Sequence, residues 1–188
     1  GRGERDLQRV QRQAEELANE QKEVASDVQG LEQAGAGRDA KAQGLAQRKE
    51  QMDAKVADLQ QQLEKLANQV RKDERDASRK LDEAAGSIRD KRIREMIRYT
   101  KGALQGQGSQ YARGMEETIG ANLDALNKKI GDAAGAMGKS SKQDAMARAA
   151  DKARDLVRGM ESAQQRMRDR QQQAANGKGQ QGQKGSEG

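Results

Sequence analysis

Residues 7 to 31 read LQRVQRQAEELANEQKEVASDVQGL, and the pattern of this stretch predicts an all-α fold. Its apolar residues recur in alternating steps of three and four, which is the heptad spacing of a coiled-coil seam. The seam positions are Leu7, Val10, Ala14, Leu17, Gln21, Val24, Val28 and Leu31. A helix with such a narrow stripe is stable only when another helix covers it. We therefore expect this helix to pack against a second one of the same kind.

A second seam with the same spacing follows a short glycine-rich break. The break is Ala34-Gly35-Ala36-Gly37, in which we expect Gly37 to stop the first helix and Asp39 to cap the next one. The second seam consists of Ala42, Leu45, Lys49, Met52, Val56, Leu59, Leu63, Leu66 and Val70. So short a connection favours an αα-hairpin. Residues 4–72 are predicted to form an antiparallel coiled-coil hairpin with its turn near 34–38.

The register of this hairpin can be written as layers that pair one residue from each seam. The layers are Leu31 with Ala42, Val28 with Leu45, Leu17 with Val56, Ala14 with Leu59, Val10 with Leu63, and Leu7 with Leu66. The same register places Asp27 near Arg48 and Glu20 near Lys55, and opposite charges on the flanks set the orientation of a coiled coil. The alternative is one continuous helix that dimerises in parallel, which two interior glycines disfavour by about 2 kcal/mol.

Further amphipathic runs follow the hairpin. Residues 73–105 are predicted to form charged amphipathic helices, one of which begins with Ser87 and Asp90 as a capping pair. Residues 110–175 are predicted to form two more helices with a turn near 135–141. Their apolar faces are Tyr111, Met115, Ile119, Leu123, Leu126, Ile130 and Ala134, then Met146, Ala149, Ala153, Leu156, Met160, Ala163 and Met167. Residues 176–188 are Gly/Gln-rich with nothing to bury, which predicts a disordered tail.

The composition supports an all-α fold made of thin seams. The chain has no Pro, Cys, His, Trp or Phe, its aromatic share is 1%, and 35% of its residues are charged. A thick globular core needs large apolar side chains, whereas a helix seam needs one apolar residue every three or four positions. No apolar run approaches the roughly 20 residues of a membrane-spanning helix. Because the chain starts at Gly1 without Met and ends in Gly/Gln repeats, we expect it to be part of a longer protein.

The sequence argues against catalysis, cofactors and metals. Residues 133–140 read AAGAMGKS, a loosened phosphate-loop pattern, but a helical face precedes it where a phosphate loop needs a strand. The adjacent acid pairs are Asp73/Glu74, Asp82/Glu83 and Glu116/Glu117. Without histidine these acids lack the usual helical metal partner and the commonest catalytic base, so we interpret them as solvated helix flanks. The predicted function is therefore not enzymatic.

One segment carries a candidate binding surface. On a helix over 87–104, four cations gather opposite the apolar face: Lys91, Arg94, Arg98 and Lys101. A basic amphipathic helix can bind an anionic membrane surface or nucleic-acid phosphates. The ordinary alternative is a bundle helix with a solvated basic face, and Tyr99 is the only aromatic residue nearby. Because Arg94 and Arg98 lie opposite the apolar face, we expect reversing both charges to leave the fold intact.

Three stretches of the sequence resemble a known group of proteins. They are residues 80–91 (KLDEAAGSIRDK), residues 97–102 (IRYTKG) and residues 154–162 (RDLVRGMES). Together with the Gly/Gln tail, they resemble uncharacterised bacterial proteins with paired N-terminal membrane helices, a long helical region and a Gly/Gln-rich low-complexity tract. The resemblance implies a soluble segment of a membrane-anchored protein.

These observations lead to two function hypotheses. The first is a structural or protein-interaction coiled-coil module, a spacer or scaffold that binds protein partners, or a second copy of itself, through its helix faces. The alternative is a set of basic amphipathic helices that bind anionic lipid or nucleic acid. The localisation and the identity of the partners stay open at this point.

Overall fold

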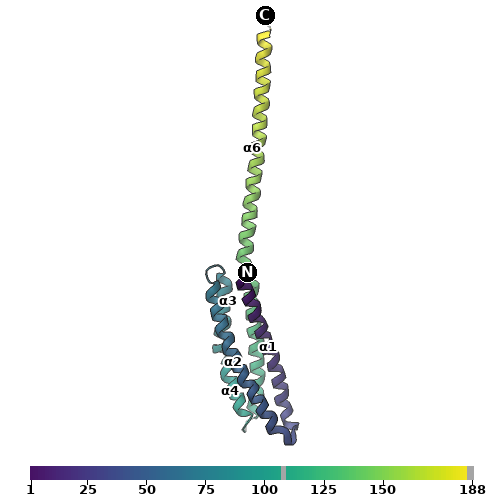
Figure 1. Ribbon diagram of the computed structural model, residues 1–188, viewed down its shortest axis with the longest axis vertical. Helices are drawn as coiled ribbons and strands as arrows, with labels where there is room; N and C mark the ends of the chain where they lie inside the picture. Colours follow the sequence, from purple (N-terminus) through teal and green to yellow (C-terminus); the bar gives the residue numbers. More distant parts are fainter. Residues whose placement is uncertain (107–108, 186–188) are drawn as a thin grey trace. The chain divides into compact units, whose positions relative to one another are not determined.

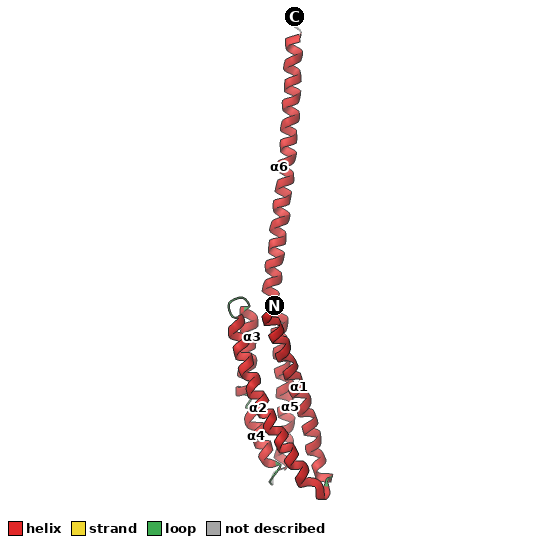
Figure 2. Cartoon of the chain, viewed as in Figure 1, coloured by secondary structure: helices red, strands yellow, loops and turns green. Residues whose placement is uncertain are grey.

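The computed structural model describes residues 1–106 and 109–185, and all of its regular structure in these ranges is helical (Figure 2). The elements are α1 (Arg2–Gly30), the 3-10 turns η1 (Leu31–Gln33) and η2 (Gly35–Gly37), α2 (Arg38–Val70), α3 (Arg75–Asp90), α4 (Ile93–Ala103), α5 (Ser109–Ala136) and α6 (Lys139–Gly185). The predicted all-α class is confirmed. The chain divides into two units, Gly1–Ser140 and Ser141–Gly188, which we describe separately.

The first unit is a helical bundle in which consecutive rods alternate in direction (Figure 1). α1 packs against α2 and α5, while α3 and α4 each pack against both α2 and α5. α3 and α4 follow one another along the bundle and together take the place of one long helix. Among the described residues of this unit, the architecture is therefore an up-down-up-down four-helix bundle whose third helix is broken.

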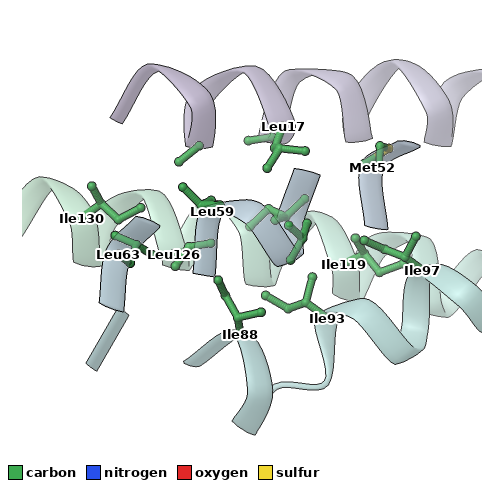
Figure 3. Close-up of a cluster of buried hydrophobic side chains, with 14 of the residues drawn as sticks. Leu17, Met52, Leu59, Leu63, Ile88, Ile93, Ile97, Ile119, Leu126 and Ile130 are labelled. Carbon is green, nitrogen blue, oxygen red and sulfur yellow. The ribbon is translucent and has the colours of Figure 1, made fainter. Parts of the chain in front are cut away.

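The core of the bundle is built from the heptad seams. The seam residues of α1 and α2 join apolar residues of α3, α4 and α5 in one continuous buried cluster. Figure 3 shows side chains from these helices turned towards a common centre, among them Leu17, Leu59, Ile88 and Ile119. Each square ångström of apolar surface that the cluster removes from water contributes about 25 cal/mol. The two predicted seams thus form two sides of a bundle as well as one hairpin.

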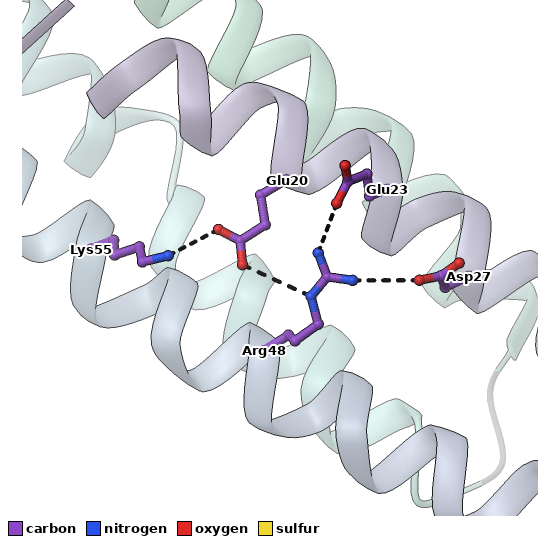
Figure 4. A network of polar contacts seen from close by, with 5 residues as sticks. All are labelled: Glu20, Glu23, Asp27, Arg48 and Lys55. Carbon is purple, nitrogen blue, oxygen red and sulfur yellow. Dashed lines mark hydrogen bonds and ion pairs between the residues drawn. The ribbon is translucent and has the colours of Figure 1, made fainter. Parts of the chain in front are cut away.

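Ion pairs between α1 and α2 lie on one flank of the hairpin (Figure 4). Arg48 Nη1 lies 3.4 Å from Asp27 Oδ2, and Lys55 Nζ lies 3.2 Å from Glu20 Oε2. Both contacts are the predicted ones and are confirmed. Arg48 Nη2 also lies 3.1 Å from Glu23 Oε2. Every residue of the predicted layers is buried except Val28, which is partly buried against the core.

The turn between α1 and α2 differs in detail from the predicted one. α1 already ends at Gly30, and the residue with left-handed backbone is Gly35 (φ 57°), not Gly37 (φ −86°). A side chain at Gly35 would be strained because L-residues rarely adopt this conformation. The N-cap of α2 is Gly37, so the prediction of Asp39 as N-cap is wrong. Asp39 lies in the first turn of α2, where its negative charge favours the positive end of the helix dipole.

The break between α3 and α4 also lies later than predicted. α3 continues through Gly86 and Ser87 to Asp90, and Ser87 Oγ donates to the Ala84 carbonyl at 2.7 Å instead of capping a new helix. The break is at Arg92, whose φ of 51° is left-handed. Ile88 and Ile93 are both fully buried although a straight helix would turn them about 140° apart. The break brings both side chains into one core, which explains its position.

The buried stripe of α5 is displaced from the predicted one at its start. Tyr111, predicted on the apolar face, is 75% exposed. The buried positions are Ala112, Glu116, Ile119, Leu123, Leu126, Ile130, Ala133 and Ala136. From Ala112 to Ala133 they keep alternating steps of four and three, so Tyr111 falls just outside the stripe. Met115 and Ala134 lie at its edges and are half-buried.

The second unit consists of the rest of α6, which continues to Gly185. The helix therefore includes most of the 176–188 segment, for which the composition predicts disorder, while residues 186–188 lie outside the described residues. Each glycine at positions 177, 179, 182 and 185 disfavours helix by about 1 kcal/mol relative to alanine. We expect the tail end of α6 to fray in solution for this reason.

Candidate functional site

The four residues predicted to bind an anionic surface do not share one helix. Arg94, Arg98 and Lys101 lie on α4, but Lys91 is the C-cap residue of α3. The left-handed Arg92 separates Lys91 from the other three. The predicted continuous basic face over 87–104 is therefore wrong, because the helix that would align its four cations is interrupted.

The three cations on α4 contact acids on α2. The Nε atoms of Arg94 and Arg98 lie 2.8 and 3.1 Å from the two carboxylate oxygens of Asp53. Lys101 Nζ lies 3.4 Å from Glu50 Oε2. The two arginines thus pair with an acid of α2 across the contact between α4 and α2, so we expect that reversing both charges destabilises the bundle.

The pKa values of Asp53 and Arg94 are both shifted by their contact. Burial by itself raises the pKa of Asp53, but hydrogen bonds and charge attraction from Arg94 and Arg98 outweigh it, so the pKa of Asp53 is lowered. The hydrogen bond to Asp53 raises the pKa of Arg94. Both shifts favour the charged pair, so Asp53 stabilises the bundle as a carboxylate.

A polar layer lies inside the bundle, with one residue from each of its rods. Lys49 Nζ of α2 donates to Thr100 Oγ1 of α4 at 2.9 Å and is ion-paired with Glu116 of α5. Gln21 Nε2 of α1 donates to Glu116 Oε2 at 2.7 Å and to the Glu116 carbonyl at 3.1 Å. All four side chains are buried. The layer joins residues up to 95 positions apart in the sequence.

The chemistry of this layer favours a structural role. Burial lowers the pKa of Lys49, and the nearby charge of Glu116 opposes this shift. A desolvated lysine with a lowered pKa can act as a catalytic amine. Lys49, however, is 0% exposed, so a substrate would reach it only if the bundle opened. Polar residues at seam positions are known to fix helix register, and the contacts of this layer form only when all four rods are aligned.

Sequence reasoning missed the layer, although its signal was readable. Gln21, Lys49 and Thr100 stand at seam or apolar-face positions of their helices. Glu116, interpreted as a solvated acid, is 4% exposed, so that interpretation is wrong. Counting three residues back from Ile119 places Glu116 on the seam of α5. The signal for a buried pair was the presence of oppositely charged residues, Lys49 and Glu116, at seam positions of two helices.

The phosphate-loop-like segment, residues 133–140, connects α5 to α6. Helix α5 precedes the turn, which contains the left-handed Gly138 (φ 82°). The Gly138 N–H donates to Glu74 Oε1 at 3.1 Å. A carboxylate thus accepts from a backbone amide that a phosphate loop would direct at its ligand. The segment is a helix–helix connection in this structure.

A second cationic surface lies on α1 and was also missed. Its residues follow one another in steps of three and four: Arg2, Arg5, Arg9 and Arg12. All four are exposed, and they line one groove together with Asp6, Gln13 and Glu16. Arg9 Nη2 lies 2.9 Å from Asp6 Oδ1. The spacing of these arginines, which places them on one helix face, could have revealed this surface from the sequence.

Exposed apolar side chains gather along α6. Its heptad positions, which we call the α6 seam, are Met146, Ala149, Ala153, Leu156, Met160, Ala163 and Met167. Within the described part of the chain these residues are exposed apart from the half-buried Ala163, and Leu156 is 67% exposed. Val157 beside the seam is exposed as well. This is the spacing that the bundle buries in α1 and α2, here in a unit whose described residues hold no second helix.

Comparison of the chain with protein-family models, with curated proteins and with solved structures finds no match. Among the described helices, none combines the length and the hydropathy needed to cross a membrane. Over residues 1–106 and 109–185, no three His, Cys, Asp or Glu side chains gather as metal ligands would.

Proposed function

We propose that this chain is a non-enzymatic structural and protein-interaction module, in which the bundle is the scaffold and α6 is the binding arm. The observation that carries the proposal is the exposed α6 seam. A heptad seam is the sequence pattern of a helix that packs against another helix. The seams of α1 and α2 bury their residues in the bundle, whereas the α6 seam keeps the same pattern on an exposed face.

The physical chemistry of an isolated helix supports this function. A single polar helix gains little from intrinsic propensity, and most helix stability in proteins comes from packing of the apolar face. A contiguous exposed apolar stripe is typical of an interaction surface. The charged residues of α6 lie mainly away from the seam, so a partner helix would cover apolar side chains without desolvating many charges.

Photo-cross-linking tests this proposal. The photoreactive residue p-benzoylphenylalanine replaces Leu156 or Met160 on the seam of the full chain, in cells that express the protein. The matched controls replace Arg158 or Gln165, which lie on the opposite face of the same turns. Covalent protein adducts should form from the seam positions and not from the controls. Absence of adducts from the seam, or equal yields from both faces, would exclude α6 as the binding arm.

The alternative function, binding to an anionic surface, is supported by a different set of residues from the one predicted. Arg94, Arg98 and Lys101 contact acids of α2, whereas the arginines of α1 form an exposed face. Anionic vesicles and duplex DNA are suitable probes, because binding driven by phosphates weakens steeply as salt rises. Arg5→Glu with Arg12→Glu should abolish binding, and Lys41→Glu with Lys128→Glu is the charge-matched control. A wild type that binds neither probe at low salt contradicts this alternative.

The resemblance to membrane-anchored coiled-coil proteins adds a location to the proposal. It would place the bundle and its arm beside a membrane, held by helices that precede the module in a longer chain. The flanking sequence tests this directly, because the resemblance predicts a pair of hydrophobic helices upstream. If neither flanking segment contains such helices, the proposed location beside a membrane is wrong.

A further inference from the structure

The α6 seam alternates side-chain size in an order that suits antiparallel pairing with itself. Between Met146 and Ala163, the residues read large, small, small, large, large, small. When a second α6 is laid antiparallel about a point between residues 154 and 155, a large residue meets alanine in every layer. The layers are Met146 with Ala163, Ala149 with Met160, and Ala153 with Leu156 of the partner copy, each present twice.

A parallel arrangement of two α6 helices lacks this complementarity. Each residue would then face its own copy, so layers of paired methionine or leucine would alternate with layers of paired alanine. The large layers would hold the helices apart at a distance that leaves gaps at the alanine layers, and gaps forfeit packing contacts. The size order of the seam therefore favours the antiparallel arrangement.

The bundle already contains this kind of packing. In the antiparallel pair of α1 and α2, the register fixed by the ion pairs of Arg48 and Lys55 matches Leu31 with Ala42 and Ala14 with Leu59. These four residues are all buried. Layers of leucine and alanine thus support antiparallel helix packing in this chain, and the α6 seam repeats them.

Charge at the edges of the seam favours the same orientation. The antiparallel register places Lys152 opposite Gly159 and Ala150 opposite Val157 of the partner copy, so no like charges face each other on these flanks. Lys142 would meet Met167, and like charges would meet only in the outermost layer, Lys139 with Arg170. A parallel pair would oppose Lys139, Lys142 and Arg170 each with its own copy, which is unfavourable.

From these observations we infer that two copies of the chain associate through their α6 seams as an antiparallel coiled coil over residues 142–167. The inference rests on the proposed function of α6 as a binding arm and names its partner. The overlap is about 39 Å long at 1.5 Å per residue. In every layer between residues 146 and 163 one of the two residues is alanine, so association is expected to be weak, on the order of micromolar.

Sedimentation equilibrium of the full chain tests the association. The wild type should approach twice the monomer mass of 20.6 kDa as its concentration rises to hundreds of micromolar. Leu156→Lys should stay monomeric, because it places a charge in the two central layers. Gln165→Lys adds the same charge on the opposite face of α6 and should dimerise like the wild type. A wild type that stays monomeric, or equal behaviour of the two variants, overturns the inference.

Engineered disulfides test the orientation, since the chain has no cysteine of its own. Ala149→Cys and Met160→Cys, mixed as two separate proteins, should oxidise to a mixed dimer because they share a layer. Each variant alone should not form a disulfide dimer, since its two cysteines would lie about 16 Å apart along the axis, beyond bridging range. Asp151→Cys mixed with Arg158→Cys, at the same level on the outer face, is the matched control and should not bridge. Self-bridging of either seam variant would indicate a parallel pair and overturn the inference.

The two proposals fail in different ways. Photo-cross-linked adducts with other proteins, without any dimer in the centrifuge, would overturn the second copy as partner and leave the binding arm in place. Absence of adducts and of dimers would exclude both. Adducts at twice the chain mass, together with a dimer that Leu156→Lys abolishes, would support both.

Discussion

Lys49 lies in a core whose other members are mostly aliphatic, and it contacts Thr100 and Glu116 there. Removing two charges from water costs several kcal/mol, and their mutual attraction offsets this cost only when both partners stay in place. The pair therefore contributes little net stability, but it strongly destabilises any arrangement in which the helices are out of register. A shift of one helix by one turn would leave Lys49 or Glu116 buried without its partner.

Lys49→Met leaves Glu116 as a buried uncompensated charge and should destabilise the bundle by about 3–5 kcal/mol. The double variant Lys49→Met with Glu116→Met restores an apolar layer and should recover most of this loss. Urea unfolding followed by circular dichroism gives the free energies of unfolding, and the double-mutant cycle gives the coupling. Additive effects of the two single changes would contradict the proposed pairing.

Asp53 should make the bundle sensitive to acid. Its ordinary pKa of 3.8 is lowered in the folded protein by Arg94 and Arg98. Such a carboxylate stabilises the fold above its unfolded pKa, and this stabilisation is lost as the pH falls through the folded pKa. Asp53→Asn should thus unfold at lower urea than the wild type at pH 7, and the gap should close as the pH falls from about 4 to 2. A gap that stays constant with pH would show that the charge of Asp53 is not the cause.

Reversing the two arginines of α4 should loosen that helix from α2. Arg94→Glu with Arg98→Glu places three acids together and should destabilise the bundle by about 1–2 kcal/mol, the scale of a partly exposed ion-pair network. The control Lys41→Glu with Lys128→Glu makes the same change in net charge at exposed positions. Thermal melts of both double variants provide the measurement. Equal melting temperatures would mean that the Asp53 contacts carry no stability.

At the scale of elements, the hairpin of α1 and α2 could be predicted because its information is local. Alternating steps of three and four determine which residues meet a neighbouring helix, whatever that neighbour is. The flank pairs of Asp27 with Arg48 and Glu20 with Lys55 follow from the same register and are present. The turn was harder to predict. Which glycine takes the left-handed conformation depends on how the chain closes between two packed helices.

The bundle around this hairpin could not be read from the seams alone. Ala18, Ala46 and Ala67 are buried beside the seams and widen each stripe, so that α1 and α2 each contact further neighbours. Alanine is equally common on solvated helix faces because of its high helix propensity, and it therefore gives no clear signal. The position of the break at Arg92 depends on the core that Ile88 and Ile93 share, which exists only once the helices are packed.

The candidate site was the least predictable part for a related reason. A single helix shows that Arg94 and Arg98 share a face but not that Asp53 of another helix lies opposite them. Their pairing is a tertiary contact between residues more than 40 positions apart. The arginine face of α1 and the α6 seam, in contrast, depend only on spacing within one helix and are visible in the sequence.

A disulfide between α1 and α2 tests the predicted layers. Leu17→Cys with Val56→Cys should oxidise within one chain at low protein concentration, because the layer brings the two β-carbons within bridging range. Leu17→Cys with Leu63→Cys is the control, since position 63 lies two turns further along α2. Electrophoresis without reductant and intact mass distinguish internal from intermolecular bridges. A Leu17/Val56 variant that bridges only between molecules would contradict the hairpin register.

At the scale of the whole molecule, the two units divide the chain's apolar surface between two uses. The bundle buries its seams against one another and aligns them with the polar layer of Lys49 and Glu116. The second unit keeps a seam of the same spacing exposed along α6. A bundle that buries its own core can present such a helix to a partner without losing its fold, which is the property that the proposed spacer or scaffold needs.

Hydrogen–deuterium exchange of the full chain, measured at several protein concentrations, tests this division most directly. Amides of α1 to α5 should be protected at every concentration, because their opening requires the bundle to unfold. Amides of residues 146–167 should exchange rapidly in dilute protein and become protected only as a partner, here a second copy, covers the seam. Protection of residues 146–167 equal to that of the bundle in dilute monomer would contradict the account, since the seam would then be covered within one chain.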